Sequence, residues 1–159
     1  AARAVAVVAE LVVAAEVAAA AGHVWSALVD WPTHGQWMLF TRVESTTAQT
    51  EGAGAGIVGI TGIGPCAFRD TMTVTSWQPP PAQPARCGVE HTGRLVRGSG
   101  AFEVETIDAG HSRVVWSEWV RPPGGLLGEI GWLGVRPVVA LFLRISLRRL
   151  AKYAEAGRR

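Results

Sequence analysis

Apolar and polar residues alternate along the middle of the chain, which is the pattern of strands with one buried face. The alternation is clearest in residues 66–78, 85–93, 98–107 and 112–120. Three further apolar segments, residues 10–17, 41–50 and 55–64, complete a prediction of seven strands. Turn-forming residues separate these segments, and the prolines between Pro79 and Pro84 are the strongest such signal.

Helical periodicity flanks the strands. Residues 21–30 place Val24, Trp25 and Leu28 on one face, and residues 33–38 add a further turn or two. Residues 137–156 form the long final element, in which an apolar stripe that includes Leu143 and Leu147 lies opposite a ladder of basic residues. The order of strand, short helices, six strands and long helix predicts an α+β fold, with an antiparallel sheet wrapped over the C-terminal helix. One domain is expected over residues 5–156.

Composition narrows the class of protein. The chain has 159 residues, of which 48% are hydrophobic and 18% charged, so a packed globular domain is expected. The net charge of +2, without a basic stripe, excludes nucleic acid as the expected partner. Fourteen of the fifteen basic residues are Arg, which with the many Ala, Val and Gly residues is typical of a high-GC bacterium.

The N-terminal apolar stretch is not expected to be a membrane span or a signal peptide, because Arg3, Glu10 and Glu16 interrupt it. We therefore expect a cytoplasmic protein. Cys66 and Cys87 are expected to lie roughly 30 Å apart on neighbouring strands, too far for a disulfide, so both are expected to be free thiols.

Motifs that would indicate a cofactor or a metal are weak or missing. Gly54–Gly59 matches G-x-G-x-x-G, but the glycines that follow it disfavour the helix that a dinucleotide site needs. A bent, glycine-rich strand is the better interpretation. The four histidines are scattered and there is no C-x-x-C or H-E-x-x-H, so neither a metal nor a cofactor is expected.

Several segments together resemble a known superfamily. They are "VWSALVDWPTHGQWM", "FRDTMTVTSWQPP", "VEHTGRLVRGSGAFEVE", "RVVWSEWV" and "LRISLRRLAKYAE". In this order they are similar to the START-like superfamily, and more closely to its bacterial polyketide cyclase/dehydrase and lipid-transport branch (SRPBCC). The resemblance implies a helix-grip fold, in which a curved sheet and the C-terminal helix enclose an apolar cavity. It implies binding of lipids, polyketides or other hydrophobic molecules, and it carries no fixed catalytic residue.

Three ionisable residues are expected to form a row on the inward face of the sheet. Alternation places Asp70, His91 and Glu118 on that face. Turns centred on the intervening loops pair Met72 with His91, His91 with Gly100, and Gly100 with Glu118. The row could be a structural network, could orient the polar group of a ligand, or could act in acid–base catalysis. In the last case His91 would exchange the proton, while Asp70 or Glu118 fixes its tautomer and raises its pKa.

The rest of the predicted ligand site is apolar. Its expected lining is Trp37, Met38, Phe68, Met72, Val89, Phe102, Trp116, Phe142 and Ser146. Trp25 is expected in the core and His23 in solvent, while the place of His34 is left open. The glycine-rich apolar segment 122–134 is expected to be a flexible loop, either a gate to the cavity or an oligomer interface.

The primary functional hypothesis is therefore a protein that binds a hydrophobic small molecule in an internal cavity. One alternative is a cyclase- or dehydratase-type enzyme that uses His91 as acid and base. Another is lipid transfer with contact between the Arg-bearing final helix and an anionic membrane surface, or a partner-protein role. Monomer and homodimer both remain open, and the identity of the ligand is not predicted.

Overall fold

The computed structural model of the chain describes residues 8–157, so the predicted start of the domain at residue 5 lies outside the described residues. Seven strands within these residues form one antiparallel sheet in the order β1-β7-β6-β5-β4-β3-β2. The strands are β1 (Ala9–Val17), β2 (Thr41–Ser45), β3 (Gly56–Thr61), β4 (Phe68–Gln78), β5 (Ala85–His91), β6 (Gly98–Asp108) and β7 (His111–Val120). The predicted strand count, element order and α+β class are confirmed, although the strand expected over 41–50 ends at Ser45.

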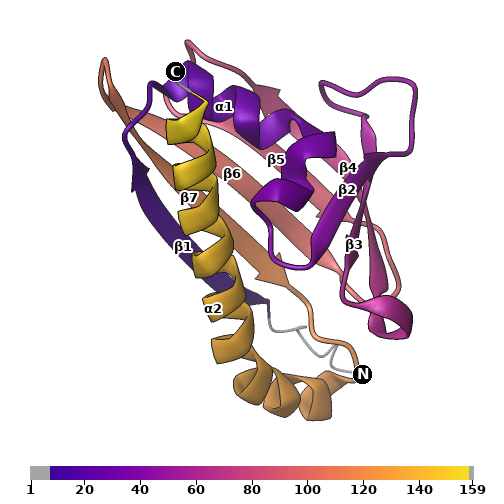
Figure 1. Cartoon of the computed structure of the whole chain (residues 1–159). Coiled ribbons are helices and arrows are strands. Elements are labelled where there is room, and N and C mark those ends of the chain that lie inside the picture. The colour runs from indigo at the N-terminus through magenta and orange to yellow at the C-terminus, as the bar shows by residue number, and fades with distance from the viewer. Residues whose placement is uncertain (1–7, 158–159) are drawn as a thin grey trace.

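Within the described part of the chain, four helical segments accompany the sheet. They are α1 (Ala21–Val29), the 3-10 helices η1 (Trp31–Gln36) and η2 (Gly64–Cys66), and α2 (Gly125–Ala156). Figure 1 shows α2 crossing one face of the curved sheet beside β1 and β7, with α1 and η1 over the same face at one end. This is the arrangement of the helix-grip fold, in which sheet and helix enclose the space between them.

The C-terminal half of α2 packs on the sheet as its periodicity predicts. Leu143, Leu147 and Leu150 are buried, whereas Arg144 and Arg148 on the opposite side are exposed. Burying a Leu side chain contributes roughly 1.5–3 kcal/mol. This half of the helix therefore supplies the apolar face that closes the core.

The N-terminal half of α2 corrects the prediction of a loop over residues 122–134. The helix begins at Gly125 and includes Pro137 in its interior. Figure 1 shows α2 bending sharply in its N-terminal half. Pro137 explains a bend there, because proline lacks the N–H for a helical hydrogen bond and its ring crowds the preceding turn. The apolar residues Leu126, Ile130 and Leu133 recur with helical spacing, a signal that the glycines obscured.

Candidate functional site

A cavity of about 670 Å³ lies between the sheet and α2. This volume is in the range of small-molecule sites, and most of the lining is apolar. The lining includes Leu11, Val43, Ile57, Val96, Val120, Pro122, Trp132, Val139 and Leu143, in addition to the predicted residues described next.

Most of the residues predicted to form the site surround this cavity. Those present are Met38, Phe68, Asp70, Met72, Val89, His91, Phe102, Trp116, Glu118 and Phe142. Trp37 and Ser146 do not line it. Trp37 is fully buried behind the wall, with its ring 6.4 Å from that of Phe102 and 6.5 Å from that of Trp116. The Ser146 hydroxyl is buried and accepts a hydrogen bond from the Leu39 backbone N–H (3.1 Å), which satisfies it within the protein.

Asp70, His91 and Glu118 form a hydrogen-bonded cluster. His91 Nδ1 lies 2.8 Å from Asp70 Oδ2, and His91 Nε2 lies 3.0 Å from Glu118 Oε2. Trp116 Nε1 donates a hydrogen bond to the other Glu118 oxygen, Oε1 (2.7 Å). The side chains of the cluster are only 6–15% exposed. Because both ring nitrogens face carboxylates, the geometry fits an imidazolium that donates to each of them.

Strand register explains why these residues meet. Met72 pairs with His91, and Gly100 pairs with Glu118, as predicted. The predicted pairing of His91 with Gly100 is wrong by two residues, because the β5–β6 turn is centred earlier and His91 pairs with Gly98. A shift of two residues keeps the same face of the strand inward. The register irregularity in β4 lies between Val74 and Ser76, beyond Asp70, so the aspartate also keeps its inward face.

Gly100 makes room for the cluster. A Cβ at this position would lie 2.8 Å from both carboxylate oxygens of Glu118, closer than such atoms approach. The missing side chain therefore leaves the space in which the Glu118 carboxylate meets His91 Nε2 and Trp116 Nε1.

Replacing Gly100 with Ala is expected to lower the free energy of unfolding by about 1–3 kcal/mol, because the added methyl displaces a hydrogen-bonded carboxylate. Gly59→Ala is the matched control, since its Cβ would meet Met72 Cε at an ordinary 3.5 Å. Alanine normally stabilises a strand relative to glycine, so the control should be neutral or stabilising. Urea unfolding measures both changes, and an equal effect of the two would contradict this account of Gly100.

The cluster changes the acid–base chemistry of His91. Burial lowers the pKa of His91, but the hydrogen bonds and negative charges of Asp70 and Glu118 outweigh burial and raise the pKa to about 10. His91 is therefore protonated at neutral pH, as its two donor bonds require. A proton exchange by His91 would have to break one of these bonds, so the geometry favours a histidine that holds two carboxylates in place.

Asp70 keeps one unused acceptor. Its Oδ2 receives the His91 proton donor, whereas its buried Oδ1 has no hydrogen-bond partner in the protein. A buried carboxylate oxygen without a donor is costly. Since Asp70 lines the cavity, this oxygen is one buried acceptor beside the cavity that no protein group pairs.

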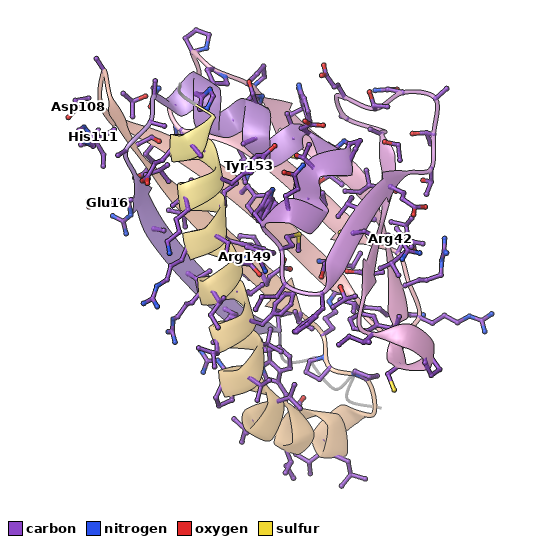
Figure 2. All side chains as sticks on the ribbon, viewed as in Figure 1. Glu16, Arg42, Asp108, His111, Arg149 and Tyr153 are labelled. Carbon is purple, nitrogen blue, oxygen red and sulfur yellow. The ribbon has the colours of Figure 1, made fainter. Side chains whose placement is uncertain are left out.

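The other histidines lie in different surroundings. His34, which the sequence left undecided, is buried and lines the cavity. His23 is half-buried instead of solvated, with Nε2 2.9 Å from the Ala154 carbonyl oxygen. His111 is exposed and pairs with Asp108 at the tip of the β6–β7 hairpin. Figure 2 shows this pair on the opposite side of the molecule from Arg42 in β2. Only His34 and His91 among the described histidines border the cavity.

Sequence reasoning missed several residues of the wall. Trp31 lines the cavity and donates its indole N–H to the Thr50 carbonyl oxygen (2.8 Å). Trp132, assigned to a loop, reaches the cavity from the bent half of α2. The helical spacing of the apolar residues around Trp132 was the signal that could have found it.

Two further expectations concern motifs and thiols. The Gly54–Gly59 segment forms a turn that continues directly into β3, which extends to Thr61, so its glycines lie in a strand and not at the start of a helix. Cys66 and Cys87 are free, as expected. Within residues 8–157, no group of three or more His, Cys, Asp or Glu side chains is arranged to hold a metal ion.

Solved structures with the same fold are numerous. The aromatase/cyclase Zhui from Streptomyces sp. R1128 superposes with a TM-score of 0.78 at 19% identity, covering 96% of each chain. The protein TTHA0849 from Thermus thermophilus gives a TM-score of 0.79 at 14% identity, covering 95% of this chain and 100% of that one. The di-domain aromatase/cyclase BexL of the BE-7585A biosynthetic pathway gives 0.69 at 17% identity, covering 91% of this chain and 45% of that one.

At these identities the likeness establishes the fold alone. Among curated proteins, no sequence matches the chain significantly. The family model described as polyketide cyclase / dehydrase and lipid transport matches residues 8–155, which is nearly the whole chain. The chain therefore belongs to the polyketide cyclase / dehydrase and lipid transport family.

Proposed function

We propose that the protein binds a hydrophobic small molecule in the cavity between the sheet and α2, with the polar end of the molecule at the Asp70–His91–Glu118 cluster. The observation that carries this proposal is a cavity of about 670 Å³ whose mostly apolar wall surrounds one fixed polar cluster. Sites for small hydrophobic ligands have this composition, in which burial supplies affinity and a few polar groups set orientation.

The cluster is better suited to orienting a ligand than to a purely structural role. A network that served only the fold would be expected to satisfy all of its atoms, yet Asp70 Oδ1 has no partner. Both hydrogen bonds of His91 fix the position of the aspartate and the glutamate beside the cavity.

The experiment that tests this function is a titration with the neutral, environment-sensitive dye Nile red. One saturable site per chain with increased emission is expected. Val89→Trp places an indole into the cavity from β5 and should weaken binding by about tenfold or more, because the dye loses space and contacts. Ile107→Trp, at an exposed position on β6, is the matched control. Absence of saturable binding, or equal effects of the two variants, would overturn the proposal.

Catalysis at this site would require a residue that can exchange a proton with the bound molecule. The fold is shared with the aromatase/cyclases named above, and the acid–base residue expected from the sequence is His91. Because its ring nitrogens are both engaged, we assign proton transfer, if the ligand is converted, to Asp70 at its unpaired oxygen. His91 would then act as a positioning residue.

A second candidate function, lipid transfer with contact to a membrane surface, is favoured by the exposed apolar side chains of α2. Leu126 and Leu127 are 72% and 81% exposed, and Ile130, Leu133 and Val138 are also exposed. By length and composition alone, α2 could span a membrane. Large exposed apolar patches mark interaction sites, and this one adjoins the part of α2 that borders the cavity.

Liposome flotation tests this second function. Vesicles of phosphatidylcholine with phosphatidylglycerol are expected to carry the protein more than vesicles of phosphatidylcholine alone, because exposed Arg136 and Arg144 lie on the same helix. The double change Leu126→Glu and Leu127→Glu should abolish flotation, whereas Ile107→Glu should not. Equal absence from both kinds of vesicle would remove this candidate.

A further inference from the structure

The donors around the polar end of the cavity are already committed. His91 donates from both ring nitrogens, and Trp116 donates to Glu118. The Thr41 hydroxyl donates to the Leu39 carbonyl oxygen (2.8 Å), and the Thr61 hydroxyl lies 2.9 Å from that of Thr41, to which it can donate. None of these groups has a hydrogen left for a ligand acceptor.

Two of the unpaired buried polar atoms on residues that line the cavity are acceptors. Asp70 Oδ1 is one of them. His34 supplies another, because its Nε2 donates to the Leu28 carbonyl oxygen (2.8 Å) and its Nδ1 has no partner. Burial lowers the pKa of His34 to about 4, so Nδ1 carries a lone pair at neutral pH. His34 is 2% exposed and lines the cavity.

The net charge of the cavity wall also favours a ligand that donates a hydrogen bond. Two carboxylates and one imidazolium leave a net charge of −1, and no Arg or Lys is among the described residues that line the cavity. Burial raises the pKa of the Cys87 thiol to about 12, so this neighbour stays neutral. The Trp132 indole N–H is unpaired, but one neutral donor cannot balance the charge of an anion.

We propose that the cavity selects hydrophobic molecules whose polar group donates a hydrogen bond, a hydroxyl or an ammonium, and discriminates against molecules that end in a carboxylate. This inference rests on the proposed binding function and names the chemistry of its ligand. A hydroxyl would satisfy Asp70 Oδ1, and an ammonium would also neutralise the cluster. A carboxylate would lose its water and meet a like charge, and the one cation beside it, His91, is already bound to two carboxylates.

Four probes with one ring system test the proposal: 2-methylnaphthalene, 2-naphthylmethanol, 2-naphthylmethylammonium and 2-naphthoate. Their dissociation constants are measured at pH 7 by displacement of Nile red, with calorimetry as a second readout. The alcohol and the ammonium are each expected to bind at least about tenfold more tightly than the carboxylate. Methylnaphthalene reports burial of the ring without a polar end.

Asp70→Asn supplies the matched variant, since it keeps the shape and removes one negative charge. The tenfold preference should shrink to about threefold or less, through tighter binding of naphthoate. Glu103→Gln is the control, because Glu103 pairs with Arg86 outside the cavity lining and the preference should stay unchanged. The wild-type preference decides the proposal by itself if Asp70→Asn fails to fold.

The outcomes separate the two proposals. Binding of methylnaphthalene together with naphthoate affinity equal to or above that of the alcohol overturns the selectivity and leaves the binding function standing. Failure of Nile red and of all four probes to bind overturns the binding function and the selectivity with it, whereas failure of the probes alone overturns only the selectivity. The expected order, with loss of discrimination in Asp70→Asn alone, supports both.

Discussion

Replacing His91 with Leu is expected to lower the free energy of unfolding by about 3–5 kcal/mol at pH 6.5, since it leaves two buried carboxylates without their shared cation. Asp70 and Glu118 each lose a charge-assisted hydrogen bond and then repel one another across the space of the imidazole. Urea unfolding followed by tryptophan fluorescence measures the loss. His111→Leu is the control, because His111 pairs with Asp108 at an exposed hairpin tip (Figure 2), and no measurable change is expected.

The pH dependence of this difference identifies its cause. The pKa of His91 rises from 6.5 in the unfolded chain to about 10 in the folded protein. The folded state then binds the extra proton throughout this interval, so the stabilisation is complete below pH 6.5 and is lost as the pH rises toward 10. Wild-type stability should fall by up to about 1.4 kcal/mol per pH unit.

His91→Leu should lack this slope, and the two proteins should converge with rising pH. The comparison is best made between pH 6.5 and 9, because the raised pKa of Cys87 adds its own loss of stability between pH 9 and 12. A constant difference across pH 6.5–9 would contradict the imidazolium cluster and indicate that the histidine contributes only by packing.

Trp37→Ala is the second change with a large expected effect, about 3–5 kcal/mol of lost stability. Trp37 is fully buried and its indole lies against His34, Phe102 and Trp116, three residues of the cavity wall. Removing it leaves a void behind that wall, so binding of Nile red should weaken as well. Thermal or urea unfolding measures the first effect and dye titration the second.

Trp37→Phe distinguishes packing from hydrogen bonding at this position. The Trp37 indole N–H has no partner, so phenylalanine loses volume but no hydrogen bond, and a cost below about 1.5 kcal/mol is expected. Trp31→Phe is the comparison, since it removes the bond from Trp31 Nε1 to the Thr50 carbonyl oxygen. A larger loss for Trp37→Phe than for Trp31→Phe would contradict this assignment.

The strands of the fold and the polar row could be predicted from the sequence, because side chains alternate between the two faces of a strand with a period of two residues. Asp70, His91 and Glu118 fall on inward positions of strongly alternating strands, and any even error in register keeps them there. That is why the row survives the two-residue error that paired His91 with Gly100 instead of Gly98. Their hydrogen bonds across a gap at Gly100 follow from that placement.

The misassigned residues depend on packing that periodicity does not encode. Ser146 and Trp37 lie on apolar faces, but whether such a face borders a cavity or a solid core is decided by the depth of each side chain. The start of α2 was misplaced because the glycines of residues 122–134 disfavour a helix by local preference, whereas the helix begins at Gly125 and includes Pro137. The partner of Ser146, the Leu39 N–H, is 107 residues away in sequence.

A crystal structure of the protein with 2-naphthylmethanol would test the central claim most directly. The account predicts the naphthalene ring inside the cavity between the sheet and α2, with the hydroxyl within hydrogen-bond distance of Asp70 Oδ1 and the His91 bonds to Asp70 and Glu118 intact. A hydroxyl directed away from the cluster toward Trp132, or a ring bound on the exposed apolar side of α2 with the cavity unfilled, would contradict it.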